Sequence, residues 1–296
     1  CADWHSHFRK KKLFMTQLKT IKIAFIGGGN MASALIGGLL QKGAVAKNIS
    51  AADPYEPTRK KLVDEFKIGV GASISEIASQ ITKANIVVLA VKPQQLKEAC
   101  TELAPIIQSG DHAPVCLSVA AGIMTGDIAR WLSHKKIIRA MPNTPALIGQ
   151  GMTGLFATAA TNDEEQRLAQ TICDAVGTTI WVKDESLMNA VTAVSGSGPA
   201  YVFAFLESLE TAAASLGIDA TTARTLAIQT VLGAANLAAQ SNDAPGTLRE
   251  KVTSKGGTTF AALQVLEQNQ WSKIIAKAIH AADARGAEMG AEFGQS

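Results

Sequence analysis

The 296-residue sequence has few aromatic residues (5%) and few charged residues (18%), and its apolar runs are short. A membrane-spanning helix needs about 20 consecutive apolar residues, so we expect no membrane segment. The four cysteines show no C-x-x-C spacing, and the histidines after residue 14, His112, His134 and His280, lack the pairing typical of metal ligands. We therefore expect no metal site, and we expect free thiols in a cytoplasmic protein.

The excess positive charge is confined to the first 14 residues. The net charge of the chain is +3, and this segment contains four Lys or Arg residues against one acidic residue. The rest of the chain is neutral overall, so we expect no basic face for nucleic acid. Residues 1–14 also lack the apolar core of a signal peptide, and Met15 resembles the natural first residue of the protein. We expect residues 1–14 to be a tag, a translated leader or a disordered arm.

A glycine-rich turn follows the first apolar segment. Ile21–Ile26 is a nearly continuous apolar run, which favours a buried parallel strand, and Asn30–Gln41 has the periodicity of a helix. Gly27 and Gly29, which lie between this strand and this helix, and Ala32 match the pattern G-x-G-x-x-A. Such a turn lets a diphosphate approach the backbone at a helix N-terminus, so we predict a dinucleotide site. A purely structural turn is the alternative.

The residues after the second strand bear on the choice of cofactor. An acidic residue about 20 positions past the glycines bonds the ribose hydroxyls of NAD, whereas Arg or Lys accommodates the 2′-phosphate of NADP. This sequence offers both, with Asp53 at the end of the strand and Arg59 and Lys60 after it. We expect NADPH, with appreciable use of NADH. Asp53 could instead begin a turn, and the basic pair could lie on a solvated helical turn.

Strands and helices alternate through residues 15–183, which predicts a doubly wound parallel α/β sheet of the Rossmann type. The strands expected after the first are Ile49–Ala52, Ile68–Val70, Ile86–Val91, Val115–Val119, Ile137–Ala140, Leu155–Ala157 and Thr179–Val182. Ligands of such sheets lie beyond the carboxyl ends of the strands. Lys92, Ala120–Gly122 and Pro142–Thr144 should therefore join the glycine turn at one edge.

The pattern becomes helical and alanine-rich after residue 183, where we place a domain boundary. The helices expected within residues 184–296 include Ser186–Val194, Pro199–Leu216, Thr221–Gln240 and Trp271–Met289. Asp219 is a candidate N-cap. The apolar residues occupy too many helix faces for a small domain to bury alone. We therefore expect an all-α dimerisation domain and an obligate homodimer, with assembly into a higher homo-oligomer left open.

Two polar, glycine-containing stretches interrupt these helices. Ser195–Tyr201 reads S-G-S-G-P-A-Y, and Ser254–Thr259 reads S-K-G-G-T-T, with a new helix expected near Thr259. A helix N-terminus with free N–H groups and nearby hydroxyls suits a bound carboxylate. Ordinary capping of a helix hairpin is the alternative.

Taken in order, the motifs of the chain resemble those of the pyrroline-5-carboxylate reductases. They are G-x-G-N-M-A, A-V-K-P at 90–93, A-A-G at 120–122, R-A-M-P-N-T-P at 139–145, and the two stretches above. The resemblance extends over residues 21–290. It implies a Rossmann domain followed by an α-helical dimerisation domain. It also implies an oxidoreductase that reduces 1-pyrroline-5-carboxylate to L-proline with NAD(P)H, the last step of proline biosynthesis.

The resemblance further implies roles for individual residues. The positions that match cofactor-binding residues of the family are Ile26, Gly27, Gly28, Gly29, Asn30, Met31, Asp53, Ala90, Val91, Lys92, Pro93, Ala120, Ala121 and Gly122. The positions that match the lining of the substrate pocket are Glu185, Lys251, Thr258 and Thr259. Some relatives have Asn where this chain has Lys251, so its backbone is the expected contact.

The implied reaction needs a hydride, a proton on the ring nitrogen and a fixed carboxylate, but no metal or covalent nucleophile. The amides of Gly257, Thr258 and Thr259 would hold the carboxylate of the imine. Thr259 is the candidate catalytic residue, because its hydroxyl could hydrogen-bond the ring nitrogen and relay the proton. A hydroxyl is a weak acid at neutral pH, so water is the alternative donor.

Two other classes of protein remain as alternatives. A dehydrogenase of the β-hydroxyacid or imine reductase type would have a catalytic Lys or Asp on its interdomain helix, yet residues 186–216 contain no Lys. A non-catalytic dinucleotide sensor or scaffold would leave the two C-terminal glycine stretches unexplained. A turnover assay separates these classes.

Overall fold

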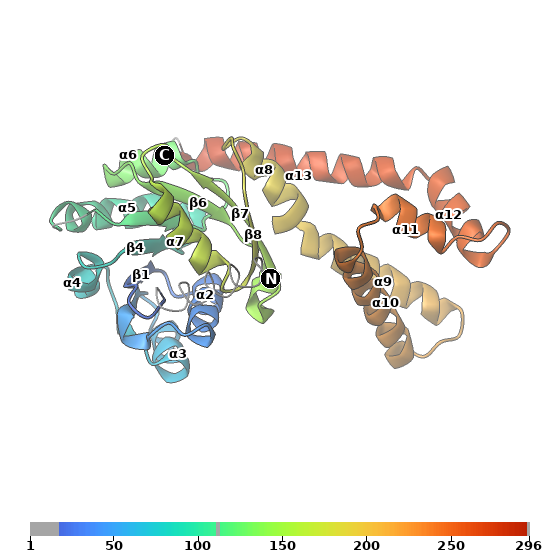
Figure 1. Cartoon of the computed structure of the whole chain (residues 1–296), viewed down its shortest axis with the longest axis horizontal. Coiled ribbons are helices and arrows are strands. Elements are labelled where there is room, and N and C mark those ends of the chain that lie inside the picture. Colours follow the sequence, from blue (N-terminus) through green and yellow to red (C-terminus); the bar gives the residue numbers. More distant parts are fainter. Residues whose placement is uncertain (1–17, 111–112, 295–296) are drawn as a thin grey trace, which may run out of the picture. The chain divides into compact units, whose positions relative to one another are not determined.

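The computed structural model describes residues 18–110 and 113–294 of the chain. The expectation for residues 1–14, with Met15 as a start, lies outside the described residues. The chain divides into two compact units (Figure 1). The first unit contains the residues up to Gly196 together with those from Ala282 onward, and the second unit is Ser197–Ala281.

The first unit is built on a sheet whose strand order is β3-β2-β1-β4-β5-β6-β7-β8. The first six strands are parallel, and β7 and β8 run antiparallel to them but parallel to each other. Their bounds are β1 Ile23–Ile26, β2 Ile49–Ala52, β3 Gly69–Gly71, β4 Ile86–Leu89, β5 Val115–Ser118, β6 Ile137–Met141, β7 Gly151–Ala157 and β8 Gly177–Trp181. The doubly wound Rossmann sheet predicted from the sequence is confirmed.

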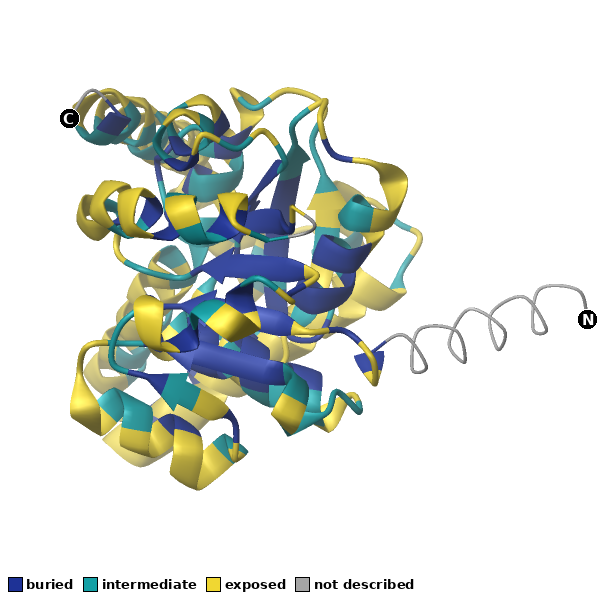
Figure 2. Cartoon of the chain, turned by 90° about the vertical axis from the view of Figure 1, so that its left-hand side faces the viewer, coloured by how far each residue is buried: buried dark blue, intermediate teal, exposed yellow. Residues whose placement is uncertain are grey.

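Helices cover both faces of this sheet. They are α2 Asn30–Gln41, α3 Glu56–Phe66, α4 Ala78–Ile81, α5 Pro93–Gln108, α6 Thr125–Leu132, α7 Asp163–Cys173 and α8 Leu187–Val191, which continues into a π-helical segment, Thr192–Gly196. Because successive side chains of a strand point to opposite faces, Ile23 and Phe25 of β1 join one buried cluster and Ala24 and Ile26 join another. Figure 2 shows the central strands in the colour of buried residues.

Several strands and helices begin or end a few residues away from the positions expected from the sequence. β7 begins at Gly151, four residues before the expected strand, because its glycine-rich start is held extended by pairing of Gly151 with Gly177 of β8. The first unit continues past residue 183 as far as Gly196. Val191 of α8 packs over Gly154 of β7, where a Cβ on the glycine would meet the valine side chain.

The second unit is helical. Its helices are α9 Gly198–Ser215, α10 Ala220–Gln240, α11 Pro245–Lys251, α12 Thr258–Gln268 and the first part of α13, Trp271–Gly294. Asp219 caps α10 as predicted, since Oδ1 accepts the N–H groups of Thr221 and Thr222, each at 3.1 Å. Many large apolar side chains of this unit are exposed, including Phe203 at 60%. Among the described helices, none combines the length and the hydropathy needed to cross a membrane.

Candidate active site

The loops after β1, β2, β4 and β5 lie at one edge of the sheet and are hydrogen-bonded to their neighbours. The N–H of Gly27 donates to the carbonyl of Ala52 at 2.8 Å, and the N–H of Ala90 donates to that of Ile26 at 2.7 Å. The N–H of Val119 donates to the carbonyl of Leu89 at 3.1 Å. The structure thus brings together the predicted cofactor-binding stretches around residues 26–31, 53, 90–93 and 120–122.

The glycine turn leaves room above the N-terminus of α2. Gly27 has φ +95°, and a Cβ there would lie 2.6 Å from the carbonyl oxygen of Ala90, so only glycine fits. Gly29 precedes the helix without a side-chain cap, and a Cβ on it would meet no atom within 4 Å. The first helical bond is the N–H of Ser33 to the carbonyl of Gly29, so the amides of Asn30 and Met31 precede it. This open, uncapped terminus fits the diphosphate of a dinucleotide.

Asp53, just after the end of β2, is hydrogen-bonded to the glycine turn. Its Oδ2 accepts the N–H of Gly28 at 2.8 Å, and its Oδ1 accepts the N–H of Tyr55 at 2.9 Å. Arg59 holds the same loop, because Nη1 donates to the carbonyls of Asp53 and Pro54 at 2.9 and 2.8 Å. Asp53 therefore forms a turn with Tyr55, and the same carboxylate also bonds the glycine turn at Gly28.

Glu185 lies in the segment between β8 and α8, within the first unit. One carboxylate oxygen accepts the N–H of Thr125 at 2.7 Å and the other accepts its hydroxyl at 2.6 Å, so Glu185 caps α6. Glu185 also pairs with Arg139 of β6, whose Nη1 lies 3.3 Å from Oε1. The three residues connect β6, the start of α6 and the segment after β8.

Arg139 is a residue whose importance the sequence reasoning missed, although it begins the R-A-M-P-N-T-P motif. Its side chain is 1% exposed, and Nη2 is buried with no hydrogen-bond partner among the described residues. Burial lowers the pKa of the Arg139 guanidinium, an effect that the charge of Glu185 opposes. A single Arg in the otherwise apolar strand Ile137–Met141 was the signal that could have identified it.

Asn143 joins two of the motifs singled out in the sequence. Its Nδ2 donates to the carbonyl of Ser195 at 3.2 Å, and its Oδ1 accepts the N–H of Met152 at 2.9 Å. The loop after β6 therefore contacts the start of the S-G-S-G-P-A-Y stretch. Pro142–Thr144 was expected at the carboxyl edge of the sheet, but no role was predicted for the amide of Asn143.

The S-K-G-G-T-T stretch lies in the second unit, where α12 begins at Thr258 instead of Thr259. Gly257 occupies the N-cap position and provides no side-chain cap. The first helical bond is the N–H of Ala261 to the carbonyl of Gly257 at 3.1 Å, so the amides of Thr258 and Thr259 precede it. Lys251, at the end of α11, pairs with Asp243 at 2.5 Å. The side chain of Lys251 is therefore paired at the surface of the second unit.

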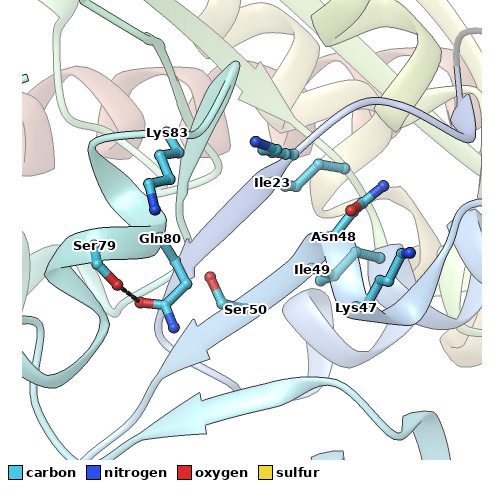
Figure 3. A pocket seen from close by; sticks show the side chains of 9 residues that line it. Ile23, Lys47, Asn48, Ile49, Ser50, Ser79, Gln80 and Lys83 are labelled. Carbon is cyan, nitrogen blue, oxygen red and sulfur yellow. Dashed lines mark hydrogen bonds between the residues drawn. The ribbon is translucent and has the colours of Figure 1, made fainter. Parts of the chain in front are cut away.

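A pocket of about 230 Å³ lies at the opposite, amino-terminal edge of the sheet. Ile23 and Ile49, the first residues of β1 and β2, line it together with Lys22, Lys47 and Lys83 (Figure 3). Because the predicted cofactor residues follow the carboxyl ends of the strands, this pocket is separate from the candidate active site.

Comparisons with known proteins agree with the arrangement. Residues 22–122 match the family model described as NADP oxidoreductase coenzyme F420-dependent. Residues 185–289 match the model described as pyrroline-5-carboxylate reductase dimerisation.

Several curated relatives of the chain are named pyrroline-5-carboxylate reductase. The protein from Pseudomonas aeruginosa is 42% identical over 94% of this chain and 100% of its own length. The protein from Haemophilus influenzae is 46% identical over 90% of this chain and 97% of its own length.

Solved structures of the same enzyme share the fold over most of the chain. The enzyme from Coxiella burnetii is 38% identical, with a TM-score of 0.85, over 91% of this chain and 98% of that one. The Plasmodium falciparum enzyme, solved with NADP bound, is 27% identical, with a TM-score of 0.80. The match covers 92% of this chain and 99% of that one. Sequence motifs, fold and relatives therefore agree, and the chain belongs to the pyrroline-5-carboxylate reductase family.

Proposed function

We propose that this chain binds the nicotinamide cofactor at the carboxyl edge of β1, β2, β4 and β5 and binds a cyclic imine at the N-terminus of α12. The chain is an NAD(P)H-dependent oxidoreductase that reduces 1-pyrroline-5-carboxylate to L-proline, the final step of proline biosynthesis. The observation that supports the two binding positions is a pair of helix N-termini, each preceded by a glycine without a side-chain cap, at Gly29 and at Gly257.

The cofactor, NADPH or NADH, supplies the hydride when it is bound. The proposed diphosphate site comprises the backbone of Ile26, Gly27, Gly28, Gly29, Asn30 and Met31. Asp53 and Arg59 face the adenosine ribose, where the guanidinium favours a 2′-phosphate and the carboxylate opposes it. Ala90–Pro93 and Ala120–Gly122, which follow β4 and β5, line the remainder of the cofactor site.

The substrate is a small cyclic imine with one carboxylate. We propose that the amides of Gly257, Thr258 and Thr259 hold this carboxylate, with the positive end of the α12 dipole in support. The hydroxyl of Thr259 is proposed to hydrogen-bond the ring nitrogen as it gains its proton. Lys251 contributes its backbone, and Glu185 is proposed to contribute to the substrate site from the segment that caps α6.

The helical sequence beyond Lys183 is proposed to be the dimerisation and substrate domain, and residues 15–183 the cofactor domain. Exposed apolar side chains on several helices of the second unit, such as Phe203, Leu232 and Ile274, support a homodimer that buries them against a second copy. We further propose that the dimer completes the active site and that dimers can assemble further. Sedimentation that finds a stable, active monomer would contradict the dimer.

A cytoplasmic location is also proposed. The three described cysteines, Cys100, Cys116 and Cys173, are buried thiols, which is the usual state in a reducing compartment. Cell fractionation with an antibody to the chain tests this location.

The activity itself is tested by mixing the purified dimer with NADPH and the imine. We expect the near-ultraviolet absorbance of NADPH to fall and L-proline to accumulate in equal amount. Omission of the imine is the control for nonspecific oxidation. A folded dimer that binds NADPH but produces no proline would favour the dinucleotide-sensor alternative.

A further inference from the structure

The loop between β5 and α6 contains Ala120–Gly122, which we have proposed to bind the cofactor. Gly122 has φ +81°, in the left-handed region where an L side chain is strained. A Cβ added to Gly122 would lie 3.4 Å from Cβ of Met289, on α13. The loop therefore packs against the C-terminal part of α13, and both belong to the first unit.

Gly290, the next residue on α13, approaches the same loop more closely. A Cβ on Gly290 would lie 2.8 Å from the carbonyl oxygen of Gly122, closer than real Cβ atoms come to a backbone oxygen. The absence of a side chain at Gly290 therefore sets the distance between the helix and the loop. An alanine here would require the loop or the helix to shift.

Two further contacts hold this part of α13 in place. Gly286, one turn earlier, faces Asn189 of α8, where a Cβ would lie at an ordinary 3.5 Å. At the end of the helix, Nη2 of Arg130 on α6 donates to the carbonyl of Gly294 at 2.8 Å. Because α6 and α8 both contact α13 on either side of Gly290, the helix has little freedom to move away from an added methyl group.

The loop is also held at its other end, where Glu185 bonds the N–H and the hydroxyl of Thr125. Glu185 begins the stretch that matches the dimerisation model, and Gly290 immediately follows its end. The two ends of the dimerisation sequence therefore support one loop of the cofactor domain.

We propose that Gly290 is a positioning residue for the cofactor: because it has no side chain, α13 can pack closely against the carbonyl of Gly122, and this packing keeps Ala120–Gly122 in the conformation that binds NADPH. The proposal rests on the proposed function, since it assumes that this loop binds the cofactor. Gly290 itself touches neither cofactor nor substrate in this proposal. Its effect should therefore appear in cofactor affinity and not in the affinity for the imine.

The test compares Gly290→Ala with Gly286→Ala, the same change one turn earlier on the same helix. NADPH affinity is measured by the quenching of tryptophan fluorescence, and KM is measured for NADPH and for the imine. Gly290→Ala should raise the Kd and KM for NADPH on the order of fivefold, with the KM for the imine changed less than about twofold. Gly286→Ala should leave all three constants unchanged, because its methyl group meets only ordinary contacts.

Hydrogen exchange of the amides in residues 120–125 gives a second readout, and they should exchange faster in Gly290→Ala. If that variant does not fold, Arg130→Ala replaces it, because this change removes the bond to Gly294, together with the ion pair to Asp127 on the same helix, without adding atoms. It should also raise the Kd for NADPH. Equal NADPH affinity in the wild type and in the folded variant would overturn the proposal. A wild-type protein that binds NADPH without turnover would instead contradict the proposed function.

Discussion

The carboxylate of Glu185 accepts two hydrogen bonds from Thr125, one from the backbone N–H at 2.7 Å and one from the hydroxyl at 2.6 Å. Met124, the N-cap residue of α6, provides no side-chain cap. Glu185, from a distant part of the chain, instead accepts the free N–H of Thr125 at the start of this helix. The same carboxylate neutralises the buried guanidinium of Arg139. One side chain thus links the loop after β5, the strand β6 and the start of the helical sequence.

Removing the Glu185 carboxylate should strongly destabilise the first unit. Glu185→Ala leaves the Arg139 charge buried without a partner, and breaking such a pair costs about 3 kcal/mol. Urea denaturation should show the loss in the free energy of unfolding. The double variant Glu185→Leu with Arg139→Met should recover much of it, because no charge then remains buried. Arg285→Ala, which breaks only exposed pairs, is the control and should change little. Equal losses in the single and double variants would contradict this explanation.

Asp53 should reduce the preference for NADPH over NADH. Its carboxylate would repel a 2′-phosphate held near Arg59, so Asp53→Ser should lower the KM for NADPH about threefold and leave that for NADH unchanged or higher. Steady-state kinetics with both cofactors measures the difference. Asp53→Asn keeps an oxygen for the N–H of Gly28 and separates loss of charge from loss of the turn. The same change in KM for both cofactors would remove Asp53 from the ribose site.

Thr259→Ala tests the proposed proton relay. The backbone amide stays, and kcat should fall roughly 10- to 100-fold with a smaller change in KM, the pattern of a bond made chiefly in the transition state. Thr259→Ser keeps a hydroxyl at this position and should restore much of kcat. Because Gly257 holds the N-cap position of α12, the hydroxyl of Thr259 has no capping bond to lose. Normal kcat with a raised KM would reduce its role to substrate binding, and normal values of both would end the catalytic assignment.

His134 should make the first unit less stable in mild acid. Burial lowers the pKa of His134 in the folded protein, although its bond to the carbonyl of Pro114 at 2.9 Å partly opposes this. The unfolded chain takes up a proton on this ring as the pH falls through about 6.5, while the folded protein does not until lower pH. Proton uptake therefore favours unfolding, and stability is lost as the pH falls below about 6.5. His134→Gln should show a smaller drop in melting temperature between about pH 7.5 and about pH 5.5. An unchanged pH dependence would exclude His134 as the cause.

The sequence alone determined the order of the elements and the positions of the two glycine stretches. Gly27 and Gly29 follow an apolar strand and precede a periodic helix, and this local pattern is sufficient to predict a turn open to a diphosphate. Asp219 before α10 was predictable for the same reason, because an N-cap bond spans only two or three residues. The extended start of β7 was missed, since its conformation depends on pairing with β8.

Only the tertiary structure decided which distant residues support the candidate active site. Arg139 and Glu185 are separated by 46 positions, and Arg130 and Gly294 by 164, so no local pattern relates them. The role of Gly290 depends on the carbonyl of Gly122, a backbone atom that every residue type provides and that therefore leaves no signal in the sequence. Local propensity fixes turns and caps because their partners are neighbours in the chain. Contacts between residues that are distant in the chain form only in the folded protein. There, close packing determines which atoms lie against each other.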